Sequence, residues 1–521
     1  MKKIISLILA VVMVTCLFAA CGNNEDYSAN ATYDPTIKVG DTGGLKLPLT
    51  KEPMKITWQV VGNEANNLND SWFIKKLEGI TGVDIELLVF PTASRDQKIS
   101  TLIASGDLPD IIGAIGSGEI ANDLAMQGAF AAVEDYVDVL PNFKKTFVDN
   151  KENSWIFDAY AAPDGKLYEF RGYDWQRDLN HAVMYRKDIF DKHGIKMWTN
   201  NDEFYSALKQ LKEIYPDSIP YTSKYGDQIF AKWSPGWGLR AHDAYFDEAE
   251  KVWKYSDIDP KYKDMLDFMK KLYDEDLMDP EFLTNTQPAW TAKMTQEAKS
   301  FVTFDWIDRM TLFKAQTKDT IPEYDLRFAN PIGPNQTYAE VSQITGGACV
   351  KKMDEDRERV AFQILDFMLS PAGKELTSMG LEGETYTLGE DGMAVMIGFE
   401  DEPGVEGTKL TEKWGLRIEG IWKGFDRRCS YFNFAPQLKE AQDYMKDKKH
   451  LEPLDPVLAY TPEEKEKINE YALKLQKAGK EFAFKYILGT ANWDDWVKEA
   501  KRLGCDEVVK MYNQAYDRNY K

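Results

Sequence analysis

The sequence predicts an α/β protein that contains more than one folded unit. Strand-like and helix-like segments alternate along residues 55–113, and a second alternating stretch begins at residue 181. An order of strand, helix, strand requires right-handed crossovers and gives a mostly parallel sheet. The length of 521 residues is enough for two to four domains with ample core.

The first unit is expected to hold three strands and two intervening helices. In chain order these segments are 55–61, 72–80, 83–89, 97–104 and 110–113. Ser71 is expected to cap the first helix, and Gly82 to end it. Ligands of such sheets bind at the carboxyl ends of strands. Asn63 and the turn around Asp107 are therefore expected near the functional edge.

The remaining elements follow from apolar periodicity and from turn residues. Further strands are expected at 167–170, 181–186, 299–304 and 348–350. Further helices are expected at 189–193, 204–211, 262–277, 361–368, 493–503 and 506–519. The buried strand 299–304 would place Asp305 and Trp306 directly at its end.

The N-terminus has the pattern of a secretory signal. Lys2 and Lys3 precede the apolar stretch 4–20, and Ala19-Ala20 stand directly before Cys21. This arrangement resembles a bacterial lipobox, which implies a signal peptide over 1–20 and a lipidated Cys21. An uncleaved membrane anchor is the alternative, because the apolar run approaches the length that spans a bilayer.

Residues 21–52 are polar, rich in Asn, Asp and Gly, and without periodicity. They are expected to form the lipidated start of the mature chain and a flexible linker to the folded part. The protein is then held on the outer face of the bacterial cell membrane by its lipid.

Charge and composition exclude several classes of function. The net charge of −21 argues against nucleic acid and anionic lipid as partners. Cys349, Cys429 and Cys505 are far apart, and the four histidines lack i,i+4 spacing, so no metal site or disulfide framework is indicated. There is no phosphate-binding G-x-x-x-x-G-K-[ST] motif, and no cofactor is expected.

Fourteen Trp and 26 Tyr residues are the unusual feature of the composition. Aromatic side chains at this density pack in cores, but they also form platforms on which sugar rings stack.

Six short sequence phrases occur in an order that is known from one family. They are Ala104–Asp110 (ASGDLPD), Asp164–Tyr168 (DGKLY), Tyr185–Gly194 (YRKDIFDKHG), Leu272–Phe282 (LYDEDLMDPEF), Gly380–Tyr386 (GLEGETY) and Tyr512–Arg518 (YNQAYDR). Together they resemble the lipoprotein-type branch of family 1 extracellular solute-binding proteins of ABC importers, which includes binders of alginate and other oligosaccharides.

This resemblance implies the type II fold of periplasmic binding proteins, in which two α/β lobes joined by a hinge enclose a ligand cleft. One lobe would comprise 53–180 plus 343–400, and the other 181–342 plus 401–521. The resemblance further implies a monomer that captures a carbohydrate and delivers it to membrane permease subunits. Relatives often carry a calcium loop after the helix that corresponds to 204–214. Residues 213–220 lack the alternating carboxylates of such a loop, so no calcium is expected there.

A sugar site needs aromatic platforms and polar side chains that make paired hydrogen bonds. The candidates are Trp58, Asn63, Trp72, Asp107, Trp233, Trp237, Asp305, Trp306, Arg309, Glu382 and Tyr386. Core packing is the alternative for each Trp, and it is the one adopted for Trp493 and Trp496. Arg427-Arg428 could meet an anionic sugar, although exposed paired arginines usually form a solvated face.

Two rival functions remain open from the sequence. A peptide or another non-sugar solute would use the same residue types. A glycoside-degrading enzyme would need a carboxylate pair, which 85 acidic residues cannot exclude. No G-x-S-x-G nucleophile motif occurs, and the S-x-x-K match at Ser206 has no partner motifs. A binding protein without catalytic activity is therefore expected.

Overall fold

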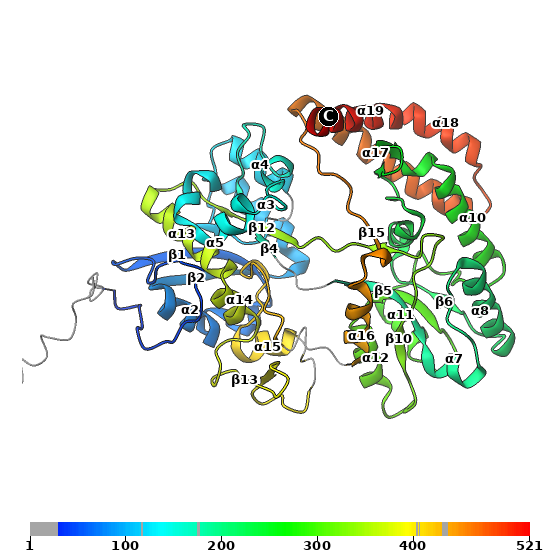
Figure 1. Ribbon diagram of the computed structural model, residues 1–521, viewed down its shortest axis with the longest axis horizontal. Coiled ribbons are helices and arrows are strands. Elements are labelled where there is room, and N and C mark those ends of the chain that lie inside the picture. The colour runs from blue at the N-terminus through cyan, green and yellow to red at the C-terminus, as the bar shows by residue number, and fades with distance from the viewer. Residues whose placement is uncertain (1–29, 116–117, 174–177, 403–404, 406, 430–435) are drawn as a thin grey trace, which may run out of the picture.

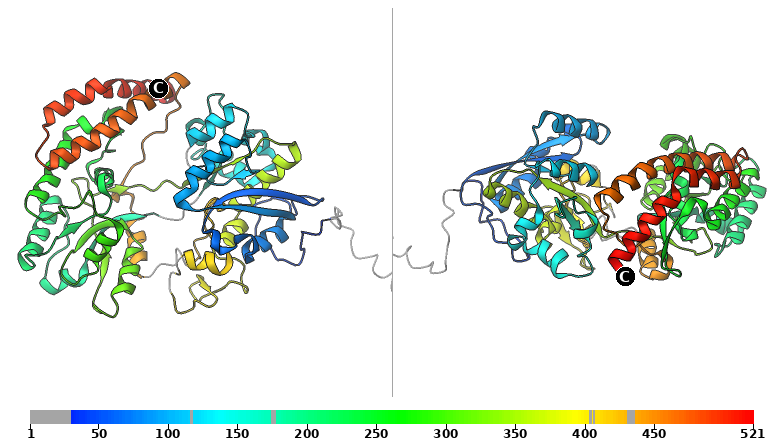
Figure 2. Two further views of the ribbon diagram at one scale, coloured as in Figure 1. Left: turned by 180° about the vertical axis from the view of Figure 1, so that it is seen from behind. Right: turned by 90° about the horizontal axis from the view of Figure 1, so that it is seen from above.

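The computed structural model describes residues 30–115, 118–173, 178–402, 405, 407–429 and 436–521. These residues form two α/β lobes that lie side by side, as Figures 1 and 2 show from three directions. Each lobe has its own sheet and its own cluster of buried apolar side chains. The expected signal peptide and the proposed lipidation at Cys21 lie outside the described residues.

The first lobe is built on a five-stranded sheet with the order β2-β1-β3-β12-β4. Its strands are β1 (Met54–Val61), β2 (Val83–Phe90), β3 (Ile111–Ile112), β4 (Glu169–Tyr173) and β12 (Ile344–Val350). β1 runs parallel to β2 and β3, which confirms the expected alternation, while β12 is antiparallel to β3 and β4. The sheet is therefore mixed.

Helices surround the first sheet. They include α2 (Trp72–Thr81), α3 (Arg95–Ser105), α4 (Gly118–Met126), α5 (Pro141–Phe143), α6 (Ile156–Ala159), α13 (Glu355–Leu369), α14 (Pro371–Ser378) and α15 (Gly407–Trp414). A hairpin of β13 (Tyr386–Leu388) and β14 (Ala394–Met396) adds to this lobe. As predicted, the Ser71 hydroxyl accepts from the Ile74 amide at the start of α2, and Gly82 ends that helix with φ 72°.

The second lobe contains a four-stranded sheet with the order β10-β5-β9-β6. These strands are β5 (His181–Arg186), β6 (Tyr221–Thr222), β9 (Val302–Trp306) and β10 (Leu326–Phe328). β5 is antiparallel to both of its neighbours, whereas β6 and β9 are parallel. Two small ribbons add to the lobe: β7 (Ala244–Asp247) with β8 (Val252–Tyr255), and β11 (Tyr338–Ala339) with β15 (Leu451–Glu452).

The helices of the second lobe come from two parts of the chain. The first set is α7 (Lys187–His193), α8 (Asn201–Ile214), α9 (Ile229–Trp233), α10 (Pro260–Asp274), α11 (Gln287–Met294) and α12 (Arg309–Thr317). The second set is α16 (Pro436–Met445), α17 (Pro462–Ile487), α18 (Trp493–Leu503) and α19 (Cys505–Tyr520). Figure 1 shows the last three helices along the top of this lobe, where α17 packs on α10. Trp496 is buried there in the second core, as predicted.

The segment before β1 is packed on the first lobe, so the expected flexible linker is wrong for residues 30–52. Leu45 and Leu49 are buried in the first core. The side-chain amide of Asn30 donates to the carbonyl oxygens of Thr50 and Gly82, both at 2.9 Å. Leucines at every second position supply apolar contacts that the polar composition of this segment conceals.

Residues 405–429 also pack in the first lobe, although the expected division assigned 401–521 to the second. Leu410, Ile418 and Cys429 are buried in the same core as β1. The chain then enters the second lobe at α16. Within residues 30–521 it therefore passes between the lobes three times: after β4, before β12 and after Cys429.

None of the described helices combines the length and the apolar character needed to cross a membrane. Among the described residues there is also no cluster of three or more His, Cys, Asp or Glu side chains that could hold a metal ion.

Candidate ligand-binding site

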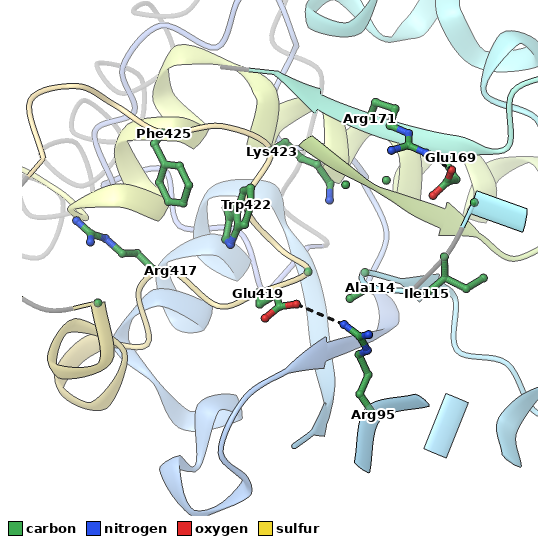
Figure 3. A pocket seen from close by; sticks show the side chains of 16 residues that line it. Arg95, Ala114, Ile115, Glu169, Arg171, Arg417, Glu419, Trp422, Lys423 and Phe425 are labelled. Atoms are coloured by element: carbon green, nitrogen blue, oxygen red, sulfur yellow. Dashed lines mark hydrogen bonds and ion pairs between the residues drawn. The ribbon is translucent and has the colours of Figure 1, made fainter. Parts of the chain in front are cut away.

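A pocket of about 630 Å³ lies in the first lobe, next to the carboxyl end of β3 (Figure 3). Gly113, Ala114 and Ile115, which directly follow β3, form one wall. The remaining walls come from the start of α3, from β4 and β12, and from the segment 417–425. The position agrees with the general expectation for ligands of parallel strands.

Backbone hydrogen bonds hold the segment 417–425 against two strands. The Val61 amide, at the end of β1, donates to the Glu419 carbonyl at 2.9 Å. The Tyr173 amide, at the end of β4, donates to the Lys423 carbonyl at 2.9 Å. Because both ends of the segment are tied down, the side chains between them are presented to the pocket.

Glycine is required where this segment meets the sheet. A Cβ atom on Gly113 would lie 2.5 Å from the Gly420 carbonyl oxygen and 2.8 Å from the indole nitrogen of Trp58. Gly420 itself has φ 100°, in the left-handed region that favours glycine. Two glycines thus allow the backbones to touch and keep the pocket floor free of side chains.

Two aromatic rings form the apolar part of the pocket. Trp422 is half-buried, and its ring centroid lies 4.8 Å from that of Phe425 with the planes tilted by 34°. A partly exposed indole beside polar groups is the arrangement that stacks a sugar ring.

Charged side chains surround these rings. Arg171 forms an ion pair with Glu169, and its guanidinium lies 3.6 Å from the centre of the Tyr160 ring. Arg95 pairs with Glu419 at 3.7 Å, the contact drawn as a dashed line in Figure 3. Both carboxylates of the pocket are therefore held by arginines.

Lys423 is the most deeply buried cation of the pocket, with only 1% of its surface exposed. Burial lowers the pKa of its ammonium to about 7, because the charged form loses its hydration. Arg171 acts in the same direction, whereas Cys349 and Glu169 oppose the shift.

A second pocket of about 280 Å³ lies in the other lobe. Asn180, His181, Lys232 and Phe304 are among its lining residues. The His181 ring lies 4.1 Å from that of Trp306, so an aromatic group stands at this pocket too. Burial lowers the pKa of Lys232, while Asp305 opposes the shift.

Asp305, which directly precedes Trp306, makes several polar contacts inside the second lobe. Its side chain is fully buried and lies 2.8 Å from the ammonium of Lys224 and 3.8 Å from Nε of Arg309. The Tyr225 hydroxyl donates to the same carboxylate at 3.2 Å. Asp305 therefore holds Lys224, Tyr225 and Arg309 in place next to Trp306.

One crossing segment connects the two pockets. Val341 lines the pocket of the second lobe, and Gly346 lines that of the first. Five residues of fully extended chain span no more than about 18 Å. The pockets therefore lie at the two ends of one short connection between the lobes.

Four of the predicted sugar-contacting aromatic residues are core residues instead. Trp58 and Tyr386 are fully buried in the first core, and the Tyr386 hydroxyl donates to Glu375 at 2.6 Å. Trp233 and Trp237 are buried in the second core, where their planes differ by 10°. A buried ring has no free face, so these four residues cannot serve as stacking platforms.

Four other candidates lie outside both pockets. Asn63 caps a short 3₁₀ turn, and Trp72 donates to Glu384 at 3.1 Å. Glu382 lines a separate hollow against residues 34–40. Asp107 is exposed in a turn that precedes β3, at the edge of the sheet opposite to the carboxyl ends. Asp305, Trp306 and Arg309 lie together at the second lobe and remain predictions.

Sequence reasoning missed the residues that build the first pocket, chiefly Arg95, Arg171, Arg417, Trp422 and Lys423. Arg427 and Arg428 do not line this pocket, and Arg428 forms ion pairs with Asp426 and Glu375. The sequence signal for this segment is the pair Trp422-Lys423, which lies between Gly420 and Gly424. Both glycines have positive φ in the structure.

A family model described as bacterial extracellular solute-binding protein matches residues 62–375, more than half of the chain. The chain belongs to this family. Solute-binding proteins of this kind act outside the cell as binders, which agrees with the resemblance found in the sequence. The matched region contains β3, β4 and β12, the strands that lie at the first pocket.

Two relatives from Bacillus subtilis (strain 168) resemble this solute-binding protein over nearly its whole length. The polygalacturonan/rhamnogalacturonan-binding protein YtcQ is 22% identical and covers 98% of both chains. The lipoprotein LipO is 25% identical, with 90% of this chain and 93% of LipO covered.

The fold is that of a solved solute-binding protein. The crystal structure of the alginate-binding protein AlgQ2 without calcium ion matches with a TM-score of 0.71 and 21% identity. The match covers 90% of this chain and 99% of AlgQ2. This likeness confirms the predicted two-lobed periplasmic-binding-protein-like fold.

Proposed function

We propose that this solute-binding protein captures an oligosaccharide between its lobes and delivers it to the permease of an ABC importer. The observation that carries the proposal is the first-lobe pocket, where half-buried Trp422 stands among charged hydrogen-bonding groups. Rings and charged donors together match the apolar faces and hydroxyl rims of a sugar. YtcQ and AlgQ2 are named for carbohydrate polymers, which supports the same class.

The proposed mechanism is closure of the two lobes on the ligand. A solute bound at the first pocket would also meet His181 and Trp306 when the lobes approach, because one short segment joins both pockets. The ligand shifts the population from open to closed by as much as it prefers the closed state. Small-angle scattering with and without ligand would measure this closure as a smaller radius of gyration.

We expect no catalysis by this protein. A glycosidase needs one protonated and one ionised carboxyl group flanking the scissile bond. The carboxylates of the pocket, Glu169 and Glu419, are instead each held by an arginine. Incubation with oligosaccharides should leave their length unchanged, and shortened products would identify an enzyme.

We further propose that a lipid on Cys21 tethers the protein to the outer face of the cell membrane. The lipobox-like sequence supports this assignment, and LipO is a named lipoprotein. The expected result is that Cys21→Ser releases the protein into the medium, whereas the native chain fractionates with membranes.

The binding test compares oligosaccharides with peptides by thermal shift and calorimetry. A ligand at a hundred times its dissociation constant adds about 2.7 kcal/mol to stability. Trp422→Ala should weaken oligosaccharide binding about tenfold to a hundredfold. Trp72→Ala is the matched control, because Trp72 is equally half-buried in the same lobe but lies outside the pocket. Shifts with peptides alone would favour a peptide binder.

A further inference from the structure

Buried hydrogen-bond donors of the first lobe lack a protein acceptor among the described residues, and one of them, Arg171 Nε, belongs to a residue that lines the pocket. Trp58 Nε1, Gln59 Nε2 and Arg171 Nε are buried and have no acceptor among the described residues. Trp58 Nε1 lies directly behind Gly113, and the side-chain oxygen Oε1 of Gln59 already accepts from the Ala114 amide at 3.2 Å. A buried donor without an acceptor costs about 1–3 kcal/mol.

Lys423 adds a buried ammonium to this set. Its side chain is 99% inaccessible, and within the described part of the chain it forms neither a hydrogen bond nor an ion pair. Figure 3 shows Lys423 between Trp422 and Arg171, with its ammonium directed into the pocket. A buried charge is ordinarily paired or neutralised, so a partner from outside would stabilise the charged ammonium in this position.

The acceptors of the pocket are already engaged. Glu169 is occupied by Arg171 and Glu419 by Arg95. What the pocket lacks is an acceptor. A sugar hydroxyl both donates and accepts, whereas an ionised carboxylate only accepts.

We propose that this pocket recognises the carboxylate of an acidic sugar, a hexuronate residue of the captured oligosaccharide, with Lys423 as its principal contact. This inference rests on the proposed capture of an oligosaccharide at the pocket. The carboxylate supplies the acceptor that Lys423 and Arg171 Nε lack, while the ring of the same sugar stacks on Trp422. Recognition is local, because the chain as a whole carries a net charge of −21.

The test uses calorimetry on the full protein with oligomers of galacturonate, glucuronate and mannuronate. Each is paired with its carboxyl-reduced form, which has the same rings without the charge. We expect at least one acidic oligomer to bind tenfold or more tightly than its reduced form. Charge-assisted hydrogen bonds correspond to about tenfold to a hundredfold in affinity. Lys423→Met should therefore remove most of the acidic preference and leave binding of reduced oligomers within about threefold.

Further variants separate the recognition of charge from a general loss of structure. Arg171→Lys keeps a positive charge in the pocket and removes the unpartnered Nε donor, so acidic binding should fall by about twofold to tenfold. Lys212→Met removes a half-buried lysine of the other lobe that lines neither pocket and should leave the acidic preference intact. Lys232→Met tests the second pocket directly. Unchanged melting temperatures or higher ones in Lys423→Met would show that the variant folds.

The outcomes distinguish the two proposals. Equal or tighter binding of reduced oligomers, or equal losses for both forms in Lys423→Met, would refute carboxylate recognition and leave oligosaccharide capture standing. Loss of the acidic preference in Lys232→Met alone would move the carboxylate to the other pocket and refute the inference. Binding of peptides but of no acidic or neutral oligosaccharide would refute the proposed function and the inference together.

Discussion

Raising the pH should stabilise the empty protein and weaken its binding of an acidic sugar over the same interval, both through Lys423. Burial holds the pKa of Lys423 at about 7, against 10.5 for an ordinary lysine. Between these values the unfolded chain binds the proton and the folded protein does not. Stability therefore rises with pH, by up to about 1.4 kcal/mol per unit and no more than about 5 kcal/mol in all.

Binding responds in the opposite direction. A carboxylate beside Lys423 favours the ammonium and raises its pKa in the complex. Affinity should be constant below pH 7 and then fall by up to tenfold per unit, until the pKa of the complex is reached. The sugar carboxylate stays ionised throughout, since its own pKa lies several units lower. Binding near pH 8 should take up a proton.

The measurement is calorimetry and urea unfolding from pH 6 to pH 9, each on native protein and Lys423→Met. The difference between the two proteins isolates Lys423 from other groups that titrate in this range. The groups that face it are Glu169 and Arg171 of β4 and Cys349 of β12. If Lys423→Met retained the pH dependence of the native protein in both measurements, the assignment to Lys423 would be wrong.

Three further predictions concern stability, each measured by urea unfolding. Trp233→Ala should destabilise the protein by about 3–5 kcal/mol, because the side chain is buried in the second core; a loss below about 1 kcal/mol would contradict this. Asp305→Asn should cost about 3–5 kcal/mol, since Lys224 loses its buried partner; an unchanged midpoint would argue against the ion pair. Leu49→Ala should cost about 2–5 kcal/mol, whereas a flexible segment would show no effect.

Local structure in this chain was predictable where the signal lies in neighbouring residues. Ser71 and Gly82 bound α2 as expected, because capping depends on the residue itself and the next three or four positions. The parallel pairing of β1 with β2 and β3 likewise follows from the alternation of strands and helices.

The pocket was not predictable in the same way. Trp58 and Trp422 are the same residue type, and only the tertiary structure buries the first and leaves the second half-exposed. The segment that carries Trp422 is held by hydrogen bonds to Val61 and Tyr173, more than 200 positions away. No periodicity within the segment records these contacts.

Asp107 illustrates a different error. A turn that follows a helix and precedes a strand lies at the amino edge of the sheet, so its polar residues face away from the ligand side. The sequence argument places this turn at the carboxyl ends of the strands, but the turn precedes β3 and therefore lies at the opposite edge.

Residues 30–52 pack on the first lobe and not on the second, so the two lobes differ in how they are connected to the N-terminus. Asn30, Leu45 and Leu49 are packed on the first lobe, so the proposed lipid on Cys21 would hold the protein through that lobe. Crossing segments join the second lobe to the first. In the proposed closure on a ligand, the first lobe would stay with the proposed lipid anchor and the second lobe would move toward it.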